Sequence, residues 1–118
     1  MHRIEHGALW LANLNPGRGT EPGKTRPVLV VQNQALLDVG HPSTLVVPLT
    51  TNLVDDAEPL RLRVKAFASL KHDSDLLIDQ LRAIDNRRLT SGPLGVCSPV
   101  FMRKVQAAIG EVLDLPGV

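Results

Sequence analysis

Hydrophobic residues along this chain gather in short runs, separated by polar segments that contain glycine and proline. Short apolar runs between turn residues are typical of β-strands. Residues 60–64 alternate strictly between an apolar residue and arginine, which predicts a strand with one solvent-exposed face. Residues 27–32 are almost continuously apolar, which predicts a strand buried on both faces. The expected strands are residues 7–14, 27–32, 43–49, 60–64 and 76–84.

Proline and the turn residues refine these expectations. Pro27 fits the first position of its strand, where a missing N–H costs least, and Pro48 indicates an edge strand or a bulge. Residues 76–84 are compatible with a helix or a strand, and the turn residues on both sides favour a strand. We expect the connecting loops and turns at residues 15–25, 40–42, 50–59 and 71–75.

A helical pattern occurs near the C-terminus. Ser98 is a suitable N-cap, and Pro99 suits the first helical position that follows it. Apolar residues then recur at helical spacing until Pro116 and Gly117, which end the pattern. These apolar positions are Val100, Val105, Ala108, Ile109 and Val112. One further turn of helix is expected at residues 34–39.

Together these elements predict the fold class. About five short strands followed by a helix indicate an α+β, mainly β protein, a small twisted barrel of antiparallel strands with a C-terminal α-helix. The length of 118 residues fits one domain, residues 1–118, with a single core region.

Composition narrows the classes of function. The chain has 13 Lys and Arg against 12 Asp and Glu, so it is not a protein that binds nucleic acid through bulk charge. Aromatic residues are only 3%, which disfavours a surface that stacks many bases. Cys97 is the single cysteine, which excludes an internal disulfide and a thiolate metal cage. The first residues contain no signal-peptide pattern and no apolar run approaches membrane-spanning length, so we expect a cytoplasmic protein without a membrane partner.

Two segments imitate known motifs. Residues 19–25 end in Gly-Lys-Thr, but Arg18 stands where a phosphate-binding loop needs glycine, and a strand rather than a helix follows. Residues 72–75 contain His and Asp without the spacing that organises a cation, so a solvated loop is the better interpretation. We expect no metal site and no cofactor.

Polar residues at the ends of expected strands form a better candidate. Arg26 stands at the start of one apolar strand, and Thr50 and Thr51 follow another. Each alone has an ordinary explanation, a surface salt bridge for Arg26 and a turn hydrogen bond for Thr50. Their joint placement beside a glycine-rich loop indicates a site, because loops next to rigid strand ends commonly carry function.

The same segments, taken together, resemble one known family, the MazF/PemK toxins of bacterial toxin–antitoxin pairs. The similarity extends from about residue 5 to about residue 113 and is specific only in combination. Its segments are Gly7-Ala8-Leu9-Trp10, Asn15-Pro16, the run from Gly19 to Asn33, Val47-Pro48-Leu49-Thr50-Thr51, Ile78 to Asp85, and Arg87-Arg88-Leu89.

The resemblance implies an SH3-like barrel that forms a homodimer and acts as a metal-independent, sequence-specific endoribonuclease on single-stranded RNA. It implies a cognate MazE-like antitoxin that wraps the dimer, and an antitoxin–toxin complex that binds operator DNA through the antitoxin. The catalytic pair maps onto Arg26 and Thr50. The residues implied in RNA binding are Arg18, Thr20, Glu21, Lys24, Asn33, Thr51, Asp79, Gln80 and Arg82.

This chemistry suits the residues, with one step left open. Metal-free cleavage uses the 2′-hydroxyl of RNA as nucleophile. Arg26 can donate two parallel hydrogen bonds to the phosphate and Thr50 can donate one. The general base is a perturbed Arg26, Asp79, Glu21 or water. Two other classes stay open, a CcdB-like inhibitor of DNA gyrase without catalysis and an SH3-like adaptor.

Overall fold

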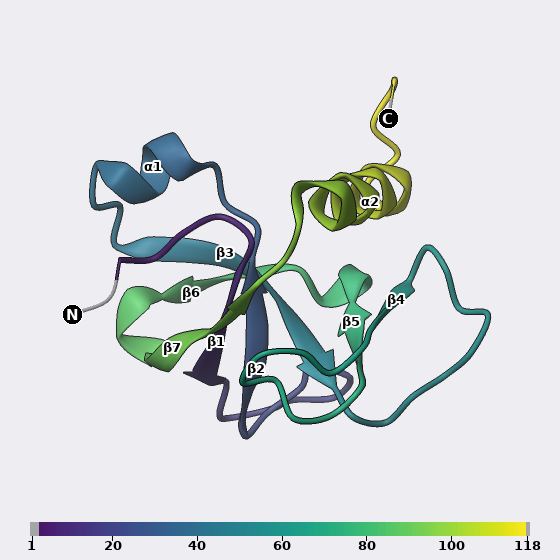
Figure 1. Ribbon diagram of the computed structural model, residues 1–118, viewed down its shortest axis with the longest axis horizontal. Coiled ribbons are helices and arrows are strands. Elements are labelled where there is room, and N and C mark those ends of the chain that lie inside the picture. Colours follow the sequence, from purple (N-terminus) through teal and green to yellow (C-terminus); the bar gives the residue numbers. More distant parts are fainter. Residues whose placement is uncertain (1–2, 118) are drawn as a thin grey trace.

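The apolar runs form one strongly curled antiparallel sheet, shown in Figure 1, in a computed structural model that describes residues 3–117. Within those residues the sheet has seven strands in the order β4-β5-β3-β2-β1-β7, and β6 pairs with β3 beside this path. The strands are β1 (Ala8–Asn13), β2 (Thr25–Val30), β3 (Ser43–Thr50), β4 (Arg61–Val64), β5 (Ser74–Leu77), β6 (Arg82–Asp85) and β7 (Leu89–Val96). The predicted mainly β class with a C-terminal helix is confirmed, and the sheet is barrel-like without closing.

β3 is the strand on which the sheet changes direction. Its first half, Ser43 to Val46, pairs with β6, and its end, Leu49 and Thr50, pairs with β5. On the edge of β3 that faces β6 and β5, Pro48 lies between the two runs of pairs, so its missing N–H interrupts neither ladder. The expectation of an edge strand or a bulge is therefore wrong, because β3 is interior and its proline marks the exchange of partners.

Three further expectations need correction. Residues 76–84 are not one strand, because a 3₁₀ turn, η1 (Ile78–Gln80), separates β5 from β6. β5 begins at Ser74, inside the expected loop, and both Ser74 and Asp75 are buried. β2 begins at Thr25, so Pro27 is its third residue and lies opposite Leu11. β7 was not expected at all.

The helices follow the predicted pattern. α1 (Gln34–Asp38) is the expected short turn, and α2 (Pro99–Val112) carries the expected cap, with Ser98 Oγ accepting a hydrogen bond from the Phe101 N–H at 3.1 Å. α2 ends at Val112, earlier than Pro116, because Asp114 adopts a left-handed conformation, with a φ of +57°, that terminates the helix. α2 buries its apolar face on one side of the sheet (Figure 1).

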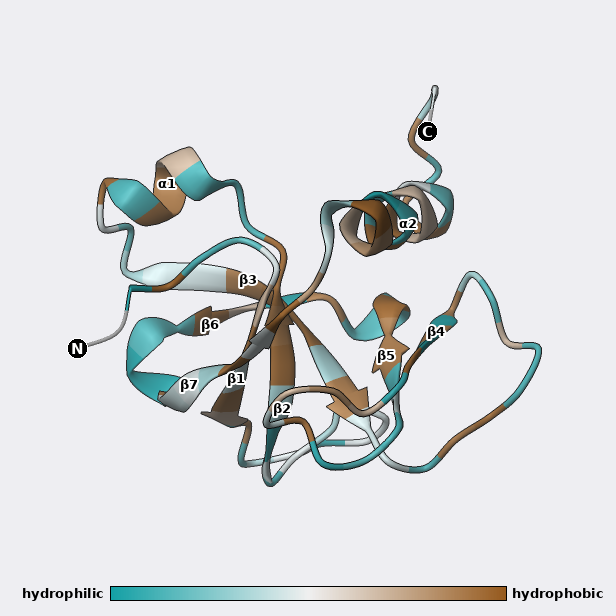
Figure 2. Ribbon diagram, in the orientation of Figure 1, coloured by the Kyte–Doolittle hydropathy of each residue, from teal (hydrophilic) through white to brown (hydrophobic). Residues whose placement is uncertain are grey.

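Two apolar clusters lie on opposite faces of the central strands. Leu9 and Leu29 point into the cluster under α2, whereas Trp10 and Val28 point into the other. Such alternation is the period of a strand, and burial on both faces explains why β2 is the brown central strand in Figure 2. The predicted two-sided burial of this strand is confirmed. The central strands thus form a rigid base for the residues at their ends. No helix in residues 3–117 is long and apolar enough to cross a membrane.

Candidate active site

A pocket of about 400 Å³ lies where β2 begins and β3 ends. Figure 1 shows these two strand ends at the lower edge of the sheet. The position of the pocket follows from strand pairing. Val28 lies opposite Pro48, and the same antiparallel register continued by two residues brings Arg26 opposite Thr50. The lining residues are Lys24, Thr25, Arg26, Pro27, Leu49, Thr50, Thr51, Asn52 and Ser74. The structure therefore places the predicted catalytic pair in one pocket.

The guanidinium of Arg26 is held by main-chain carbonyls. Nε donates to the Gly23 oxygen at 2.9 Å, and Nη1 donates to the Leu49 oxygen at 3.3 Å. A guanidinium carries five N–H donors, so three remain for a ligand. Arg26 makes no ion pair with any carboxylate of residues 3–117, so the ordinary explanation of Arg26 as a partner in a surface salt bridge does not apply. The half-buried Arg26 thus presents a fixed, uncompensated positive charge.

Thr50 is the last residue of β3 and is half-buried. Its Oγ1 accepts a hydrogen bond from the Asn52 N–H at 3.2 Å, which is the ordinary turn contact of a threonine at a strand end. The hydroxyl proton is not used by this contact. Thr50 can therefore cap the strand and donate to a ligand at once.

The glycine-rich loop reaches the pocket only at its C-terminal limb. Lys24 lines the pocket, and its N–H donates to Asn15 Oδ1 at 2.7 Å. The two limbs touch at Gly17 and Gly23, because a Cβ on Gly17 would lie 2.7 Å from the Gly23 nitrogen. The tip of the loop is exposed and away from the lining. It carries three predicted RNA-binding residues, Arg18, Thr20 and Glu21.

Other predicted RNA-binding residues lie further along the sheet. Arg82 is opposite Val46, which is about 13 Å along β3 from Thr50 at the usual rise of a strand. Asp79 and Gln80 lie on η1, between β5 and β6. None of the three lines the pocket.

Asn33 lies apart from all of these residues. It follows the far end of β2, and its Oδ1 accepts a hydrogen bond from the Ala35 N–H at 2.8 Å, which caps α1. Figure 1 shows α1 at the opposite end of the sheet from the start of β2. A structural role as helix cap accounts for Asn33 in this structure.

Sequence reasoning missed the buried carboxylate next to the pocket. Asp75 pairs with Thr50 across β3 and β5, and its side chain is 1% exposed. It accepts from Arg63 Nε at 2.6 Å, Val54 N at 2.8 Å and Arg61 Nη1 at 3.3 Å. Burial alone would raise the pKa of Asp75, but these hydrogen bonds outweigh it and lower the pKa. The alternation of Arg61 and Arg63 along β4 was the feature of the sequence that could have indicated a buried acidic partner.

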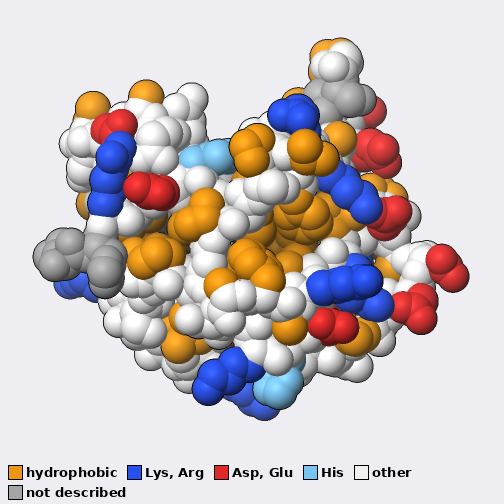
Figure 3. Space-filling view, in the orientation of Figure 1, with side chains coloured by type: hydrophobic (Ala, Val, Ile, Leu, Met, Phe, Trp, Pro, Cys, Tyr) orange, Lys and Arg blue, Asp and Glu red, His pale blue; other side chains and the backbone are white. Residues whose placement is uncertain are grey.

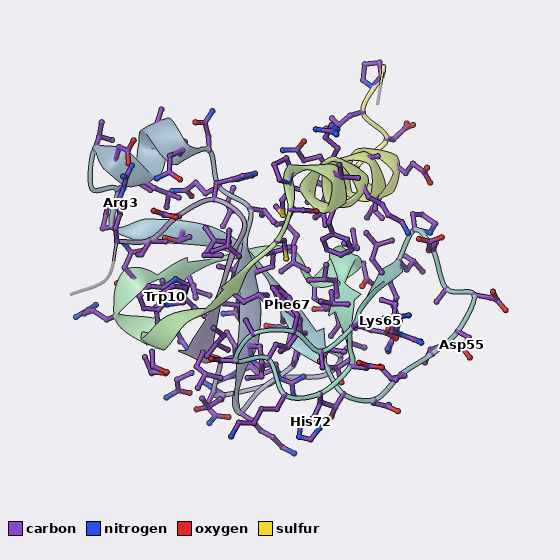
Figure 4. The ribbon with its side chains drawn as sticks, viewed as in Figure 1. Arg3, Trp10, Asp55, Lys65, Phe67 and His72 are labelled. Atoms are coloured by element: carbon purple, nitrogen blue, oxygen red, sulfur yellow. The ribbon has the colours of Figure 1, made fainter. Side chains whose placement is uncertain are left out.

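A larger, apolar pocket of about 490 Å³ lies between β4, β7 and the start of α2. Its apolar side chains include Phe67, Val96 and Phe101, and Figure 3 shows hydrophobic side chains gathered on this face beneath α2. In Figure 4, Phe67 lies near the middle of the face and Lys65 beside β4. Burial raises the pKa of the Cys97 thiol to about 11, so this thiol is unreactive near neutral pH. The pocket suits contact with a partner rather than chemistry.

The fold and the pocket that holds Arg26 and Thr50 indicate a class of protein. Residues 3–117 contain no group of three or more His, Cys, Asp or Glu that could hold a metal ion. A fixed arginine and a threonine hydroxyl, both on rigid strand ends, form an anion site suited to a phosphate group. The fold and this site are those of a small α+β domain with a pocket whose Arg and Thr donors suit an anion.

Comparison with known proteins gives the family. Residues 5–113 match the family of PemK-like, MazF-like toxins of type II toxin–antitoxin systems. This chain belongs to that family. It is 34% identical over 91 residues to the endoribonuclease EndoA of Bacillus subtilis strain 168, a match that covers 74% of this chain and 75% of that protein.

Solved structures share the fold. MazF from Deinococcus radiodurans has a TM-score of 0.80 at 23% identity, with 97% of this chain and 99% of that chain covered. An endoribonuclease in complex with its cognate antitoxin, from a mycobacterial species, has a TM-score of 0.73 at 21% identity and covers 100% of both chains.

Proposed function

We propose that this chain is a metal-independent, sequence-specific endoribonuclease that cleaves single-stranded RNA in the cytoplasm and so stops translation. The observation that carries the proposal is the pairing of Arg26, which has no carboxylate partner among the described residues, with Thr50 in one pocket. The likeness to EndoA, a named endoribonuclease, supports the same activity.

The proposed reaction is a transfer within the RNA. The 2′-oxygen forms a bond to the adjacent phosphorus, and the bond from phosphorus to the 5′-oxygen of the next nucleotide breaks. The products are a 2′,3′-cyclic phosphate and a 5′-hydroxyl, with one proton lost from the 2′-hydroxyl and one gained by the 5′-oxygen. Negative charge grows on the phosphorane oxygens, where the free N–H groups of Arg26 and the Thr50 hydroxyl would donate hydrogen bonds.

The pocket itself bears on the choice of general base. None of its lining residues is a carboxylate or a histidine, and neither Asp79 nor Glu21 is among them. The nearby Asp75 is engaged by two arginines. Because an arginine guanidinium is too weak a base to take the proton, we favour water as its acceptor.

We also propose that the protein acts as a homodimer and that a cognate antitoxin inhibits it. The antitoxin complexes among the similar solved structures support an antitoxin partner. Lys65 lines the apolar pocket and makes no ion pair with a carboxylate of residues 3–117, which favours an acidic partner segment with apolar anchors. Such a segment would fold on binding.

One experiment tests the activity. The purified protein is incubated in EDTA with a long single-stranded RNA, and new 5′ ends are read by primer extension. We expect cuts at one short recurring sequence, their loss in Arg26→Ala, and their persistence in Arg103→Ala, a control on the exposed face of α2. A folded protein that makes no cuts would contradict the proposal and direct the next assay to DNA supercoiling by gyrase.

A further inference from the structure

The turn that follows Thr50 is held in place by side chains of β4 and β5. Arg61 Nη1 donates to the Asn52 carbonyl oxygen at 2.9 Å and to Asp75 Oδ2 at 3.3 Å. Asp75 Oδ2 also accepts from the Val54 N–H at 2.8 Å. Residues 52–54 are thus fixed at both of their ends by one ion pair, although all three are exposed.

This turn in turn fixes the hydroxyl of Thr50. The Asn52 N–H donates to Thr50 Oγ1 at 3.2 Å. A threonine hydroxyl has one proton and two lone pairs, and this contact occupies one lone pair. The proton must then point away from Asn52, and the pocket shared with Arg26 is the space that Thr50 lines. The Asn52 amide therefore excludes one direction for the Thr50 proton and leaves the side of the pocket open to it.

We propose that Arg61 is a positioning residue for Thr50: by donating to both the Asn52 carbonyl and Asp75, it fixes residue 52, keeps the Asn52 N–H on Thr50 Oγ1 and leaves the hydroxyl proton free to point at the scissile phosphate. This role rests on the proposed ribonuclease activity. Arg61 does not line the pocket and so touches no reacting atom.

Arg63 offers a matched control on the same strand. It donates to the same carboxylate over a shorter distance, 2.6 Å against 3.3 Å. Its other partner is Asp55 rather than Asn52. Replacing Arg63 therefore disturbs the charge of Asp75 at least as much, and leaves the link from Arg61 to Asn52 in place.

The test is a double-mutant cycle on single-turnover cleavage of an RNA that contains the recognised sequence. Arg61→Met and Arg63→Met keep the aliphatic stems and remove the donors, and each is combined with Thr50→Ala. We expect Arg61→Met to lower the cleavage rate about tenfold at unchanged half-saturating RNA concentration, because the donor is misaimed rather than lost. Arg63→Met should change the rate less than about twofold. In the Thr50→Ala background, Arg61→Met should have no further effect.

Other results would overturn the inference. An equal loss of rate in both arginine variants, or a loss from Arg61→Met that persists without the Thr50 hydroxyl, would show a general effect on the fold. Where Arg61→Met does not fold, Arg61→Gln gives the same readout, because its amide ends two atoms short of the Nη1 position that reaches both the Asn52 oxygen and Asp75. Hydrogen exchange at the Asn52 amide, faster in the Arg61 variant than in the Arg63 variant, reports the link without activity. A wild type that does not cleave RNA overturns the proposed function and the role of Arg61 with it, while unchanged exchange at Asn52 in an active enzyme overturns the inference alone.

Discussion

Arg26 and Leu49 are joined by a hydrogen bond from Nη1 to the main-chain oxygen, 3.3 Å long, and Leu49 directly precedes Thr50. The guanidinium is therefore anchored to the strand that carries the second candidate catalytic residue. Its other anchor is the Gly23 oxygen at the base of the glycine-rich loop. Both anchors are backbone atoms, so the orientation of Arg26 does not depend on another flexible side chain.

This anchoring predicts that charge alone cannot replace Arg26. Arg26→Lys keeps a positive charge but cannot hold two carbonyls and also donate a parallel pair of hydrogen bonds to phosphate. We expect the single-turnover cleavage rate to fall about a hundredfold. Arg103→Lys on α2 serves as the control. A lysine variant within twofold of the wild-type rate would show that Arg26 acts only as a point charge.

The contact between Gly17 and Gly23 predicts a second effect at the same anchor. A Cβ on Gly23 would lie 2.8 Å from the Gly17 nitrogen, so Gly23→Ala must push the two limbs of the loop apart. The Gly23 oxygen that accepts from Arg26 would move with them. We expect slower cleavage with little change in the thermal midpoint, because the loop is largely exposed. Gly19→Asn is the control, since Gly19 has a φ of +58° that asparagine tolerates and nothing within 4 Å of its Cβ position. Equal cleavage rates for both variants would show that the contact between Gly17 and Gly23 does not position Arg26.

The basic side chains around the pocket predict a salt-dependent affinity for RNA. Each phosphate that a lysine or arginine neutralises adds about −0.7 to the slope of log affinity against log salt for single strands. Lys24 lines the pocket, so Lys24→Ala should make the slope shallower by about that amount in binding titrations. Lys104→Ala should not change the slope, because Lys104 on α2 already forms an ion pair with Glu58 at 3.3 Å. Affinity that does not change with salt would exclude a groove that follows phosphates.

The Asp75 network predicts a loss of stability in acid. Its pKa is lowered in the folded protein, so the unfolded chain binds more protons below its ordinary pKa of about 4. The stabilisation is fully present above that pH and is lost as the pH falls through the lowered folded value. Asp85, whose pKa Arg87 lowers to about 2, acts in the same direction.

Asp75→Asn should lower the free energy of unfolding at neutral pH by about 2 kcal/mol, because a buried charged hydrogen-bond acceptor is lost. Urea unfolding measures this loss. Its stability should also fall less than that of the wild type as the pH is lowered below about 4. Asp56→Asn, an exposed neighbour in the preceding loop, is the control for the change in net charge. Parallel stability curves for Asp75→Asn and wild type would show that the carboxylate does not titrate as described.

Most of the site was visible in the sequence as residues at strand ends, but its geometry was not. The pattern placed Arg26 at the start of one strand and Thr50 at the end of another. That they face each other depends on the register of β2 and β3, which the turn of residues 31–42 and long-range packing determine. The burial of Asp75 could not be predicted locally, because a charged segment is typical of a loop. In the structure two arginines compensate the buried carboxylate.

The missing strand has a more specific cause. β7 contains Gly92, Pro93 and Gly95, residues that normally indicate a loop. The structure shows why both glycines are needed. A Cβ on Gly92 would lie 2.5 Å from the Trp10 ring, and one on Gly95 would lie 2.9 Å from the Phe67 ring. These two aromatic rings fill the space that side chains on β7 would take, a relation that no local pattern reveals.

This packing predicts that Gly92→Ala destabilises the fold. Trp10 is 7% exposed and lies in the cluster with Val28 and Val30, so its indole has little room to move away from a new methyl group. Overpacking of this kind costs about 1–3 kcal/mol. Urea unfolding followed by the fluorescence of Trp10, the only tryptophan, measures the loss directly. Ser91→Ala, an exposed neighbour on the same strand, should leave the midpoint almost unchanged. If Gly92→Ala matches it, the indole has space that the structure does not show, and β7 tolerates side chains for which the observed packing leaves no room.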